Sequence, residues 1–261
     1  MQPGIVADEI DRNFASAVRI GTSLGLRRYE VRFLTTGRAP MCDRREMEEV
    51  ERIAAGEGVA VTALSPGLFK LTADAAAFRR EMAEVYPRAA AWALRWKLPG
   101  LIVFGFQRDA ADCEPYFAEA AARAAEDGLI LMVEPEPICR VNTARSAAAL
   151  IAAIGSPALR INYDPGNVAW LENRDPLDEF PCAAPFLGNV HVKDMLPLSG
   201  GAAEPEWVPA GEGIIDYRAH FAALRRARYA GPISLEPHMN GRPETIRRCL
   251  EAFQKCWQEA P

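Results

Sequence analysis

The chain has 261 residues, a net charge of −5, 49% hydrophobic residues and 25% charged residues, which is the composition of an ordinary soluble protein. This mild acidity disfavours nucleic acid and membrane surfaces as partners, because both usually require a basic patch. Six widely spaced cysteines without a CxxC pair disfavour a zinc ribbon or a disulfide framework. The N-terminus lacks a secretory pattern and no apolar run could span a bilayer, so we expect a cytoplasmic protein, either a monomer or a homo-oligomer.

Short apolar runs recur along the chain and indicate strands. Most are rich in Val, Ile, Leu or Phe, which is typical of parallel strands that are buried on both faces. The eight runs cover residues 4–6, 29–34, 58–64, 100–104, 129–133, 159–163, 188–192 and 232–235. The first run is the least secure of these predictions, because it is short and has few β-branched residues.

Helical patterns lie between these runs. Asp11 is expected to cap the first helix, and the spacing of Asp43 and Glu46 predicts a capping box. Pro87 should kink or split the Ala-rich segment 73–97. Further helices are predicted over 115–127, 143–155 and 243–257, and another begins at Asp216.

Strand–helix units therefore occupy nearly the whole chain. With no interdomain linker between them, they predict a single (β/α)₈ TIM barrel that spans residues 1–261. An open, doubly wound sheet is the main alternative. Such a sheet usually has a Gly-rich phosphate loop after its first strand, but residues 5–9 contain no GxGxxG pattern.

Acidic or imidazole side chains follow four consecutive predicted strands, at the end where barrel enzymes build their active sites. They are Glu134, Asp164, His191 and Glu236. A single acid at a strand end is more often a helix cap, and a single histidine is more often a packing residue. Three unpaired carboxylates at one barrel mouth would repel one another, whereas a divalent cation would offset that cost. One imidazole with three carboxylates suits Mn²⁺, Mg²⁺ or Co²⁺, with Zn²⁺ as a further candidate.

The alternation of side chains along a strand constrains which residues face the barrel interior. Glu134 and Glu136 share a face, so the pattern alone leaves the choice of ligand between them open. Lys193 shares a face with His191. Asp194 has the opposite parity, so we expect it to orient a neighbour or to cap the following turn.

Seven short motifs occur in order along the chain: YEVR, LSPGLFK, VEPEP, NYDPGN, HVKD, PAGEG and YAGPISLEPH. Their order and spacing resemble the xylose isomerase-like barrel superfamily, which includes sugar-phosphate isomerases and epimerases and inosose dehydratases. The resemblance implies a divalent metal ion held by Glu134, Asp164, His191 and Glu236. It selects Glu134 over Glu136 as the ligand, and Glu136 becomes a candidate for contact with the substrate.

Two positions depart from the ketose 3-epimerase branch of that superfamily. Arg140 stands where the branch has a glutamate, and Pro197 stands where it has an arginine. Both family residues contact substrate, so their absence disfavours a ketose 3-epimerase. HVKD and GEG are closer to the inosose dehydratase and general isomerase branches. The endonuclease IV branch requires more histidines than His191, His220 and His238.

The chemistry that fits these residues is proton abstraction beside a carbonyl, through an enediolate stabilised by the metal ion. Glu134 and Glu236 are predicted to act as the base and the acid. Return of the proton gives isomerisation or epimerisation, whereas loss of a β-hydroxyl gives dehydration. We predict a metal-dependent isomerase or epimerase of a small sugar, sugar phosphate or other polyhydroxy carbonyl compound. A dehydratase is the first alternative, and a non-catalytic sugar-binding barrel is the second.

Loop residues at the barrel mouth are candidates for contact with a carbohydrate substrate, although each is as often a surface charge or a structural ion pair. They are Arg32, Lys70, Gln107, Glu136, Asn167, Lys193 and Trp207. The cations Arg32, Lys70 and Lys193 are expected to hold an acidic or phosphorylated group. Phe69 and Phe106 are expected to line the wall. Residues 198–206, rich in Gly and Ala, are expected to form a mobile lid.

Overall fold

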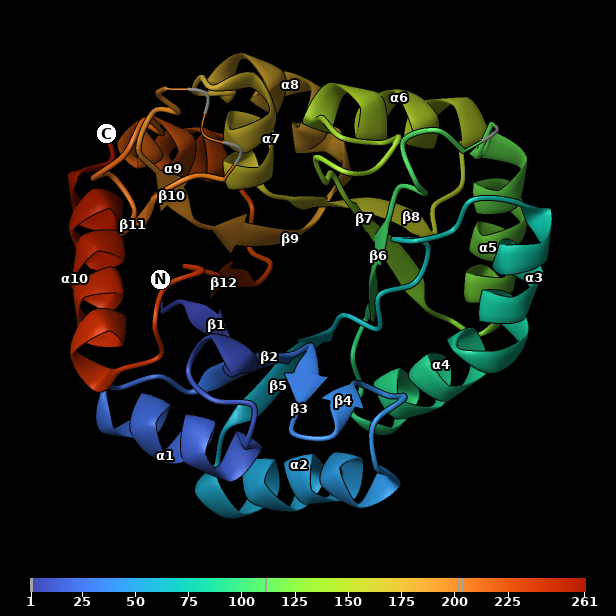
Figure 1. Ribbon diagram of the computed structural model, residues 1–261, viewed down its shortest axis with the longest axis horizontal. Coiled ribbons are helices and arrows are strands. Elements are labelled where there is room, and N and C mark those ends of the chain that lie inside the picture. The colour runs from blue at the N-terminus through green and yellow to red at the C-terminus, as the bar shows by residue number, and fades with distance from the viewer. Residues whose placement is uncertain (1, 111, 201, 203) are drawn as a thin grey trace.

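The computed structural model describes residues 2–110, 112–200, 202 and 204–261 (Figure 1). Parallel strands close into one barrel, and helices surround it, so the predicted (β/α)₈ TIM barrel is confirmed. In order around the barrel, the strands are β1 (Gly4–Val6), β12 (Ile233–Leu235), β9 (Leu187–Val192), β8 (Leu159–Tyr163), β7 (Ile130–Glu134), β6 (Gly100–Phe104), β5 (Ala60–Leu64) and β2 (Arg28–Val31). The short first strand closes the barrel by pairing with both β12 and β2.

Two short antiparallel pairs lie outside the barrel sheet. They are β3 (Phe33–Leu34) with β4 (Gly37–Arg38), and β10 (Asp194–Met195) with β11 (Trp207–Val208). The prediction of one strand over 29–34 was therefore wrong at its end. The chain leaves the barrel after Val31, and the Phe33 N–H donates to Asp8 Oδ1 at 3.2 Å instead of to a barrel strand.

Helices cover the outside of the barrel (Figure 1). They are η1 (Ala7–Glu9), α1 (Phe14–Ser23), α2 (Arg44–Glu57), α3 (Ala75–Glu84), α4 (Tyr86–Arg95), α5 (Glu114–Glu126), α6 (Ala144–Ile154), α7 (Pro165–Glu172), η2 (Leu177–Glu179), α8 (Phe180–Ala183), η3 (Ala184–Phe186), α9 (Tyr217–Arg226) and α10 (Pro243–Glu259). The segment 73–97 is split beside Pro87, as predicted. None of these described helices is long and apolar enough to cross a membrane.

Two predictions about helix starts were wrong. Asn13 caps α1 instead of Asp11, because its side chain accepts a backbone N–H of the first turn. Asp43 caps α2 as predicted, but no capping box forms there. The Glu46 carboxylate instead accepts the backbone N–H of Thr36 at 3.0 Å and so ties the β3–β4 hairpin to α2.

The barrel interior changes from apolar to polar along its strands. Ala63, Ile102 and Met132 form a small buried cluster. Because alternate residues of a strand share a face, Phe104 and Glu134 continue the faces of Ile102 and Met132 toward the carboxyl ends. The polar strand ends that the sequence indicated therefore meet at one mouth of the barrel.

Asp194 fixes the loop that follows β9. Its carboxylate accepts four backbone N–H groups at 2.8–3.2 Å, from Met195, Gly211, Gly213 and Ile215. A Cβ at Gly213 would collide with Asp194 Oδ1, so the loop approaches this closely only because that residue is glycine. The expectation from strand parity, that Asp194 caps the following turn, is confirmed.

Asp194→Ala should lower the free energy of unfolding by about 3 kcal/mol, because four backbone donors lose their acceptor. Asp74→Ala is the matched control. Asp74 is an exposed helix cap that accepts one N–H, from Ala77, and its loss should cost about 1 kcal/mol. Urea unfolding measures both changes. A smaller loss for Asp194→Ala than for Asp74→Ala would contradict the proposed anchoring role.

Candidate active site

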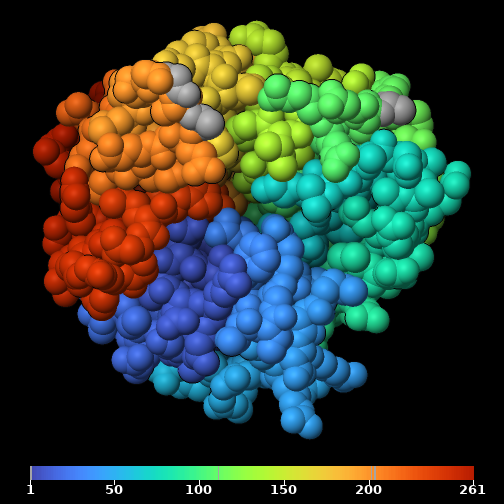
Figure 2. Space-filling model, in the orientation of Figure 1, coloured from blue at the N-terminus to red at the C-terminus, as the bar shows by residue number. Residues whose placement is uncertain are grey.

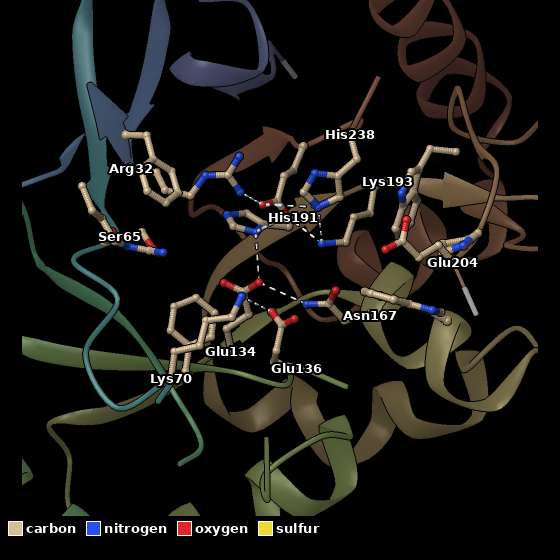
Figure 3. A pocket seen from close by; sticks show the side chains of 17 residues that line it. Arg32, Ser65, Lys70, Glu134, Glu136, Asn167, His191, Lys193, Glu204 and His238 are labelled. Atoms are coloured by element: carbon tan, nitrogen blue, oxygen red, sulfur yellow. Dashed lines mark hydrogen bonds and ion pairs between the residues drawn. The ribbon is translucent and has the colours of Figure 1, made fainter. Parts of the chain in front are cut away.

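A pocket of about 410 Å³ opens at the carboxyl ends of the barrel strands. Figure 2 shows a hollow near the centre of this face, where segments from both ends of the chain meet. Side chains from several strand ends point into the pocket (Figure 3). Four of them form a compact cluster: Glu134, Asp164, His191 and Glu236.

Each member of this cluster comes from a different strand. Glu134 ends β7, Asp164 follows β8, His191 lies in β9 and Glu236 follows β12. All four are buried, and one ligand atom from each lies within 4.8 Å of the others. Two ligands of a Mg²⁺ ion are at most about 4.2 Å apart, so the cluster is close to the size that such an ion requires.

Asp164 has two roles at the start of α7. Its Oδ1 atom accepts the Asn167 N–H at 3.1 Å and caps the helix. Its Oδ2 atom is buried and has no hydrogen-bond partner among the described residues, although the Lys193 ammonium lies 2.7 Å away. Burial raises the pKa of Asp164, and Lys193 counteracts this. A buried carboxylate oxygen without a hydrogen bond is an appropriate ligand for a metal ion.

His191 presents one ring nitrogen to the cluster and the other to Glu30. Its Nδ1 atom lies 3.2 Å from Glu236 and 3.8 Å from Glu134, and its Nε2 atom lies 2.9 Å from Glu30 Oε2. Burial lowers the pKa of His191, but these carboxylates more than offset it, so the pKa is raised. A carboxylate on the outer nitrogen is the usual support for a metal-binding histidine. Sequence reasoning missed Glu30; its only signal was an acid inside the apolar YEVR strand.

Buried amides fix the orientation of Glu134. Asn162 donates to its Oε2 atom at 3.0 Å, and Asn167 donates to its Oε1 atom at 3.1 Å. Asn189 donates to Asn162 Oδ1 at 2.9 Å and lies 3.4 Å from Glu30. These hydrogen bonds connect Asn162, which orients Glu134, to Glu30, which holds His191. The Asn167 amide, a predicted substrate contact, is thus also engaged with the protein.

Two predicted substrate cations, Arg32 and Lys193, are paired with carboxylates of the protein. Arg32 contacts Asp8 at 2.9 Å, Glu9 at 2.8 Å, and Glu236. Lys193 Nζ lies 2.7 Å from Glu236 Oε2. Burial raises the pKa of Glu236, but Lys193, His191 and Arg32 more than offset it, so its pKa lies well below the usual range. Glu236 is therefore held as a carboxylate.

Three of the other predicted substrate contacts line the pocket, and one lies outside it. Lys70, Glu136 and Trp207 line the pocket, and Lys70 Nζ lies 3.1 Å from Glu136. Burial raises the pKa of Glu136, and Lys70 opposes that rise. Gln107 is exposed and is not among the described residues that line the pocket.

The expected wall residues were wrong, and the mobile lid stays a prediction. Phe69 and Phe106 are fully buried against each other, with ring centroids 5.5 Å apart, so they belong to the core. The aromatic wall is instead formed by Phe33, Phe104 and Trp207, with Trp170 beside them. Within the expected lid 198–206, residues 201 and 203 lie outside the described residues. Glu204 and Pro205 of this segment do line the pocket.

Sequence reasoning did not select His238 as a site residue. It follows β12 and lines the pocket, with its side chain 33% exposed. Its Nδ1 atom lies 3.2 Å from Glu9 Oε1, and its backbone N–H donates to Glu9 Oε2 at 2.8 Å. Its ring packs against Trp207, with centroids 5.1 Å apart. The LEPH motif was the only sequence signal for this placement.

The model of the xylose isomerase-like TIM barrel family matches residues 18–256, and the chain belongs to that family. The putative L-ribulose-5-phosphate 3-epimerase SgbU of Escherichia coli is 26% identical over 144 residues, which are 55% of this chain and 49% of that protein. The chain therefore spans about half the length of this curated relative.

Two solved structures share the fold over almost their full lengths. The IOLI protein with a bound zinc atom has a TM-score of 0.78 at 14% identity, covering 100% of this chain and 99% of its own. The probable 3-DHS dehydratase AsbF of Bacillus anthracis has a TM-score of 0.73 at 17% identity, covering 97% and 99%. Similar proteins thus include an epimerase and a dehydratase by name.

Arg32→Ala should lower the free energy of unfolding by about 3 kcal/mol, because Asp8, Glu9 and Glu236 lose a cation that they share in a buried position. Lys70→Ala is the matched control, since Lys70 pairs with one carboxylate and its side chain is 28% exposed; it should cost about 1 kcal/mol or less. Urea unfolding without added metal measures both. Equal losses would contradict a structural role for Arg32.

Proposed function

We propose that this protein is a divalent-metal-dependent isomerase or epimerase of a small sugar, sugar phosphate or other polyhydroxy carbonyl compound. The observation that carries the proposal is the buried cluster of Glu134, Asp164, His191 and Glu236 at the floor of a pocket. Three carboxylates whose ligand atoms lie within 4.8 Å of one another would be stabilised by a divalent cation. Two of them are glutamates, which are suited to moving a proton at adjacent carbon atoms.

The donor set fits such an ion. Three carboxylate oxygens and one imidazole suit a hard or borderline cation, and Asp164 Oδ2 is a buried acceptor without a hydrogen bond among the described residues. Glu30 holds the outer nitrogen of His191 and leaves Nδ1 facing the three carboxylates. When bound, a divalent ion would polarise a carbonyl oxygen of the substrate and acidify the neighbouring C–H.

The protein residues then supply proton transfer and orientation. Glu236 is kept as a carboxylate by Lys193 and Arg32, which also make it a weak base that requires an acidified C–H. Glu134 is held in one orientation by two amides and is the partner that returns or accepts a proton on the other side of the reacting carbon. The rings of Phe104 and Trp207 offer apolar surface to the C–H faces of a polyol and restrict the entry of water.

Dehydration is the second candidate. The same proton abstraction leads to loss of a β-hydroxyl when the substrate carries one. Arg140, which stands where ketose 3-epimerases have a glutamate, directs its guanidinium to the carbonyl oxygen of Ala110, and it is not among the described pocket residues. The chain therefore lacks one contact of the ketose 3-epimerases, which disfavours that branch and keeps dehydration as the second candidate.

Solvent deuterium exchange tests the proton-transfer step. With Mn²⁺ in ²H₂O, the protein should introduce deuterium beside the carbonyl of a keto-sugar, an inosose or hydroxypyruvate, as read by NMR. Glu236→Gln should abolish the exchange, because an amide cannot accept the proton. Glu212→Gln, an exposed acid paired with Arg248, is the control and should retain it.

Exchange that persists in Glu236→Gln would remove Glu236 from the mechanism. The same spectra distinguish isomers and epimers from dehydration products. Carbohydrate binding without exchange for every substrate would favour the non-catalytic sugar-binding barrel.

Metal analysis tests the ligand set separately. The wild-type protein should bind a single divalent ion per chain, whereas Asp164→Ala and His191→Ala should bind much less. Glu30→Gln should keep the stoichiometry but weaken the affinity by about 10- to 100-fold, because the outer nitrogen of His191 loses its carboxylate. Elemental analysis and metal titration give the two readouts. Undiminished stoichiometry in Asp164→Ala and His191→Ala would contradict the metal site.

A further inference from the structure

Arg38 differs from the other cations that line the pocket in that its side-chain hydrogen bonds go to a serine and not to a carboxylate. It ends β4 and lines the pocket, and its guanidinium donates to the Ser65 carbonyl oxygen and to Ser65 Oγ, each at 3.1 Å. Arg32, Lys193 and Lys70 each contact at least one carboxylate. Within the described part of the chain, no ion pair involves Arg38.

The position of the Arg38 guanidinium is fixed by its surroundings. It stacks over the Phe33 ring at 4.8 Å and lies 5.6 Å from the centroid of the Phe104 ring. A Cβ at Gly67 would lie 2.6 Å from Arg38 Nε, and Gly67 has a φ of +81°, so this loop position favours glycine. Burial and the neighbouring Arg32 lower the pKa of Arg38, and Glu134, Asp8 and Glu236 oppose this shift without offsetting it.

Further donors lie near Arg38. Lys70 Nζ lies 4.7 Å from the centroid of the same Phe104 ring, and Ser65 contributes a hydroxyl. In Figure 3, Ser65 and Lys70 lie on one side of the buried cluster, and Lys193 and Glu204 lie on the other. A guanidinium, an ammonium and a hydroxyl are the donors that bind phosphate and carboxylate groups.

We propose that Arg38, together with Ser65 and Lys70, binds an anionic group at one end of the substrate. This inference rests on the proposed function, because it assigns a substrate class to the same pocket. The carbonyl end of the substrate lies at Glu134 and Glu236, and a phosphate or carboxylate lies against Arg38. The substrate is therefore a sugar phosphate or a sugar acid and not a neutral sugar.

Three unreactive ligands test this assignment by calorimetry in the presence of Mg²⁺: ribitol, ribitol 5-phosphate and ribonate. None has a ketone or an aldehyde, so the measurement reports binding alone. The wild-type protein should bind at least one of the two anions about tenfold more tightly than ribitol, since charge-assisted hydrogen bonds contribute that much. The ligand that gains affinity identifies the group as phosphate or carboxylate.

Arg38→Ala should abolish the preference for the anion and leave the affinity for ribitol unchanged, which also reports an intact pocket. Ser65→Ala should weaken the preference, because Arg38 loses one of its two anchors. Arg12→Ala is the matched control. Arg12 is exposed, lies over the same Phe33 ring at 5.1 Å and is not among the described pocket residues, so its loss should preserve the preference.

Equal or undetectable affinity of the wild-type protein for all three ligands would overturn the proposal. An anion preference that persists in Arg38→Ala would also overturn it. If Arg38→Ala fails to fold, an undiminished preference in Ser65→Ala overturns the proposal, and a weakened one supports it. Deuterium exchange without an anion preference contradicts only this subsite, whereas an anion preference without exchange contradicts only the proposed activity.

Discussion

The pocket depends on one constraint: carboxylates are buried at the ends of neighbouring strands, and each must be compensated where it lies. Glu236 is the clearest case, because it contacts Lys193 at 2.7 Å, His191 at 3.2 Å, and Arg32. Burial alone would make this carboxyl group neutral. The three cationic groups instead keep its pKa well below the usual range. A charged base is thereby maintained where water is largely excluded.

The same constraint shapes the backbone around the site, because single residues serve both the fold and the pocket. Asp164 caps α7 with one oxygen and leaves the other to the cluster. Gly166 has no side chain where a Cβ would collide with Lys193, so the first turn of α7 can approach that lysine. Asp194 is not among the described pocket residues, and it anchors the loop after β9 through backbone N–H groups. Substitutions at these positions therefore affect stability and the site together.

The sequence predicted the barrel and most of its four-residue cluster because both depend on a local pattern, a polar residue directly after an apolar run; the choice of Glu134 over Glu136 came from the family resemblance. It could not predict which charges pair across the barrel. Glu30 belongs to β2 and His191 to β9, and they meet only because the barrel closes through β1 and β12. Arg32 lines the pocket, as expected, but the sequence did not indicate that it also pairs with Asp8 and Glu9 of η1. The carboxylates nearest in space thus decide the role of each cation.

The distribution of charge in the pocket also favours one orientation of the substrate. Lys193 and Arg32 pair with Glu236, whereas Arg38, which also lines the pocket, forms no ion pair among the described residues. A substrate with an anion at one end has two ways to enter. With its anion at Arg38 the substrate gains a charge-assisted partner, whereas in the reversed orientation the anion competes with Glu236 for Lys193 and Arg32, which are already paired. The pairing of the other cations therefore leaves Arg38 as the group that determines which carbon of the substrate reaches Glu134 and Glu236.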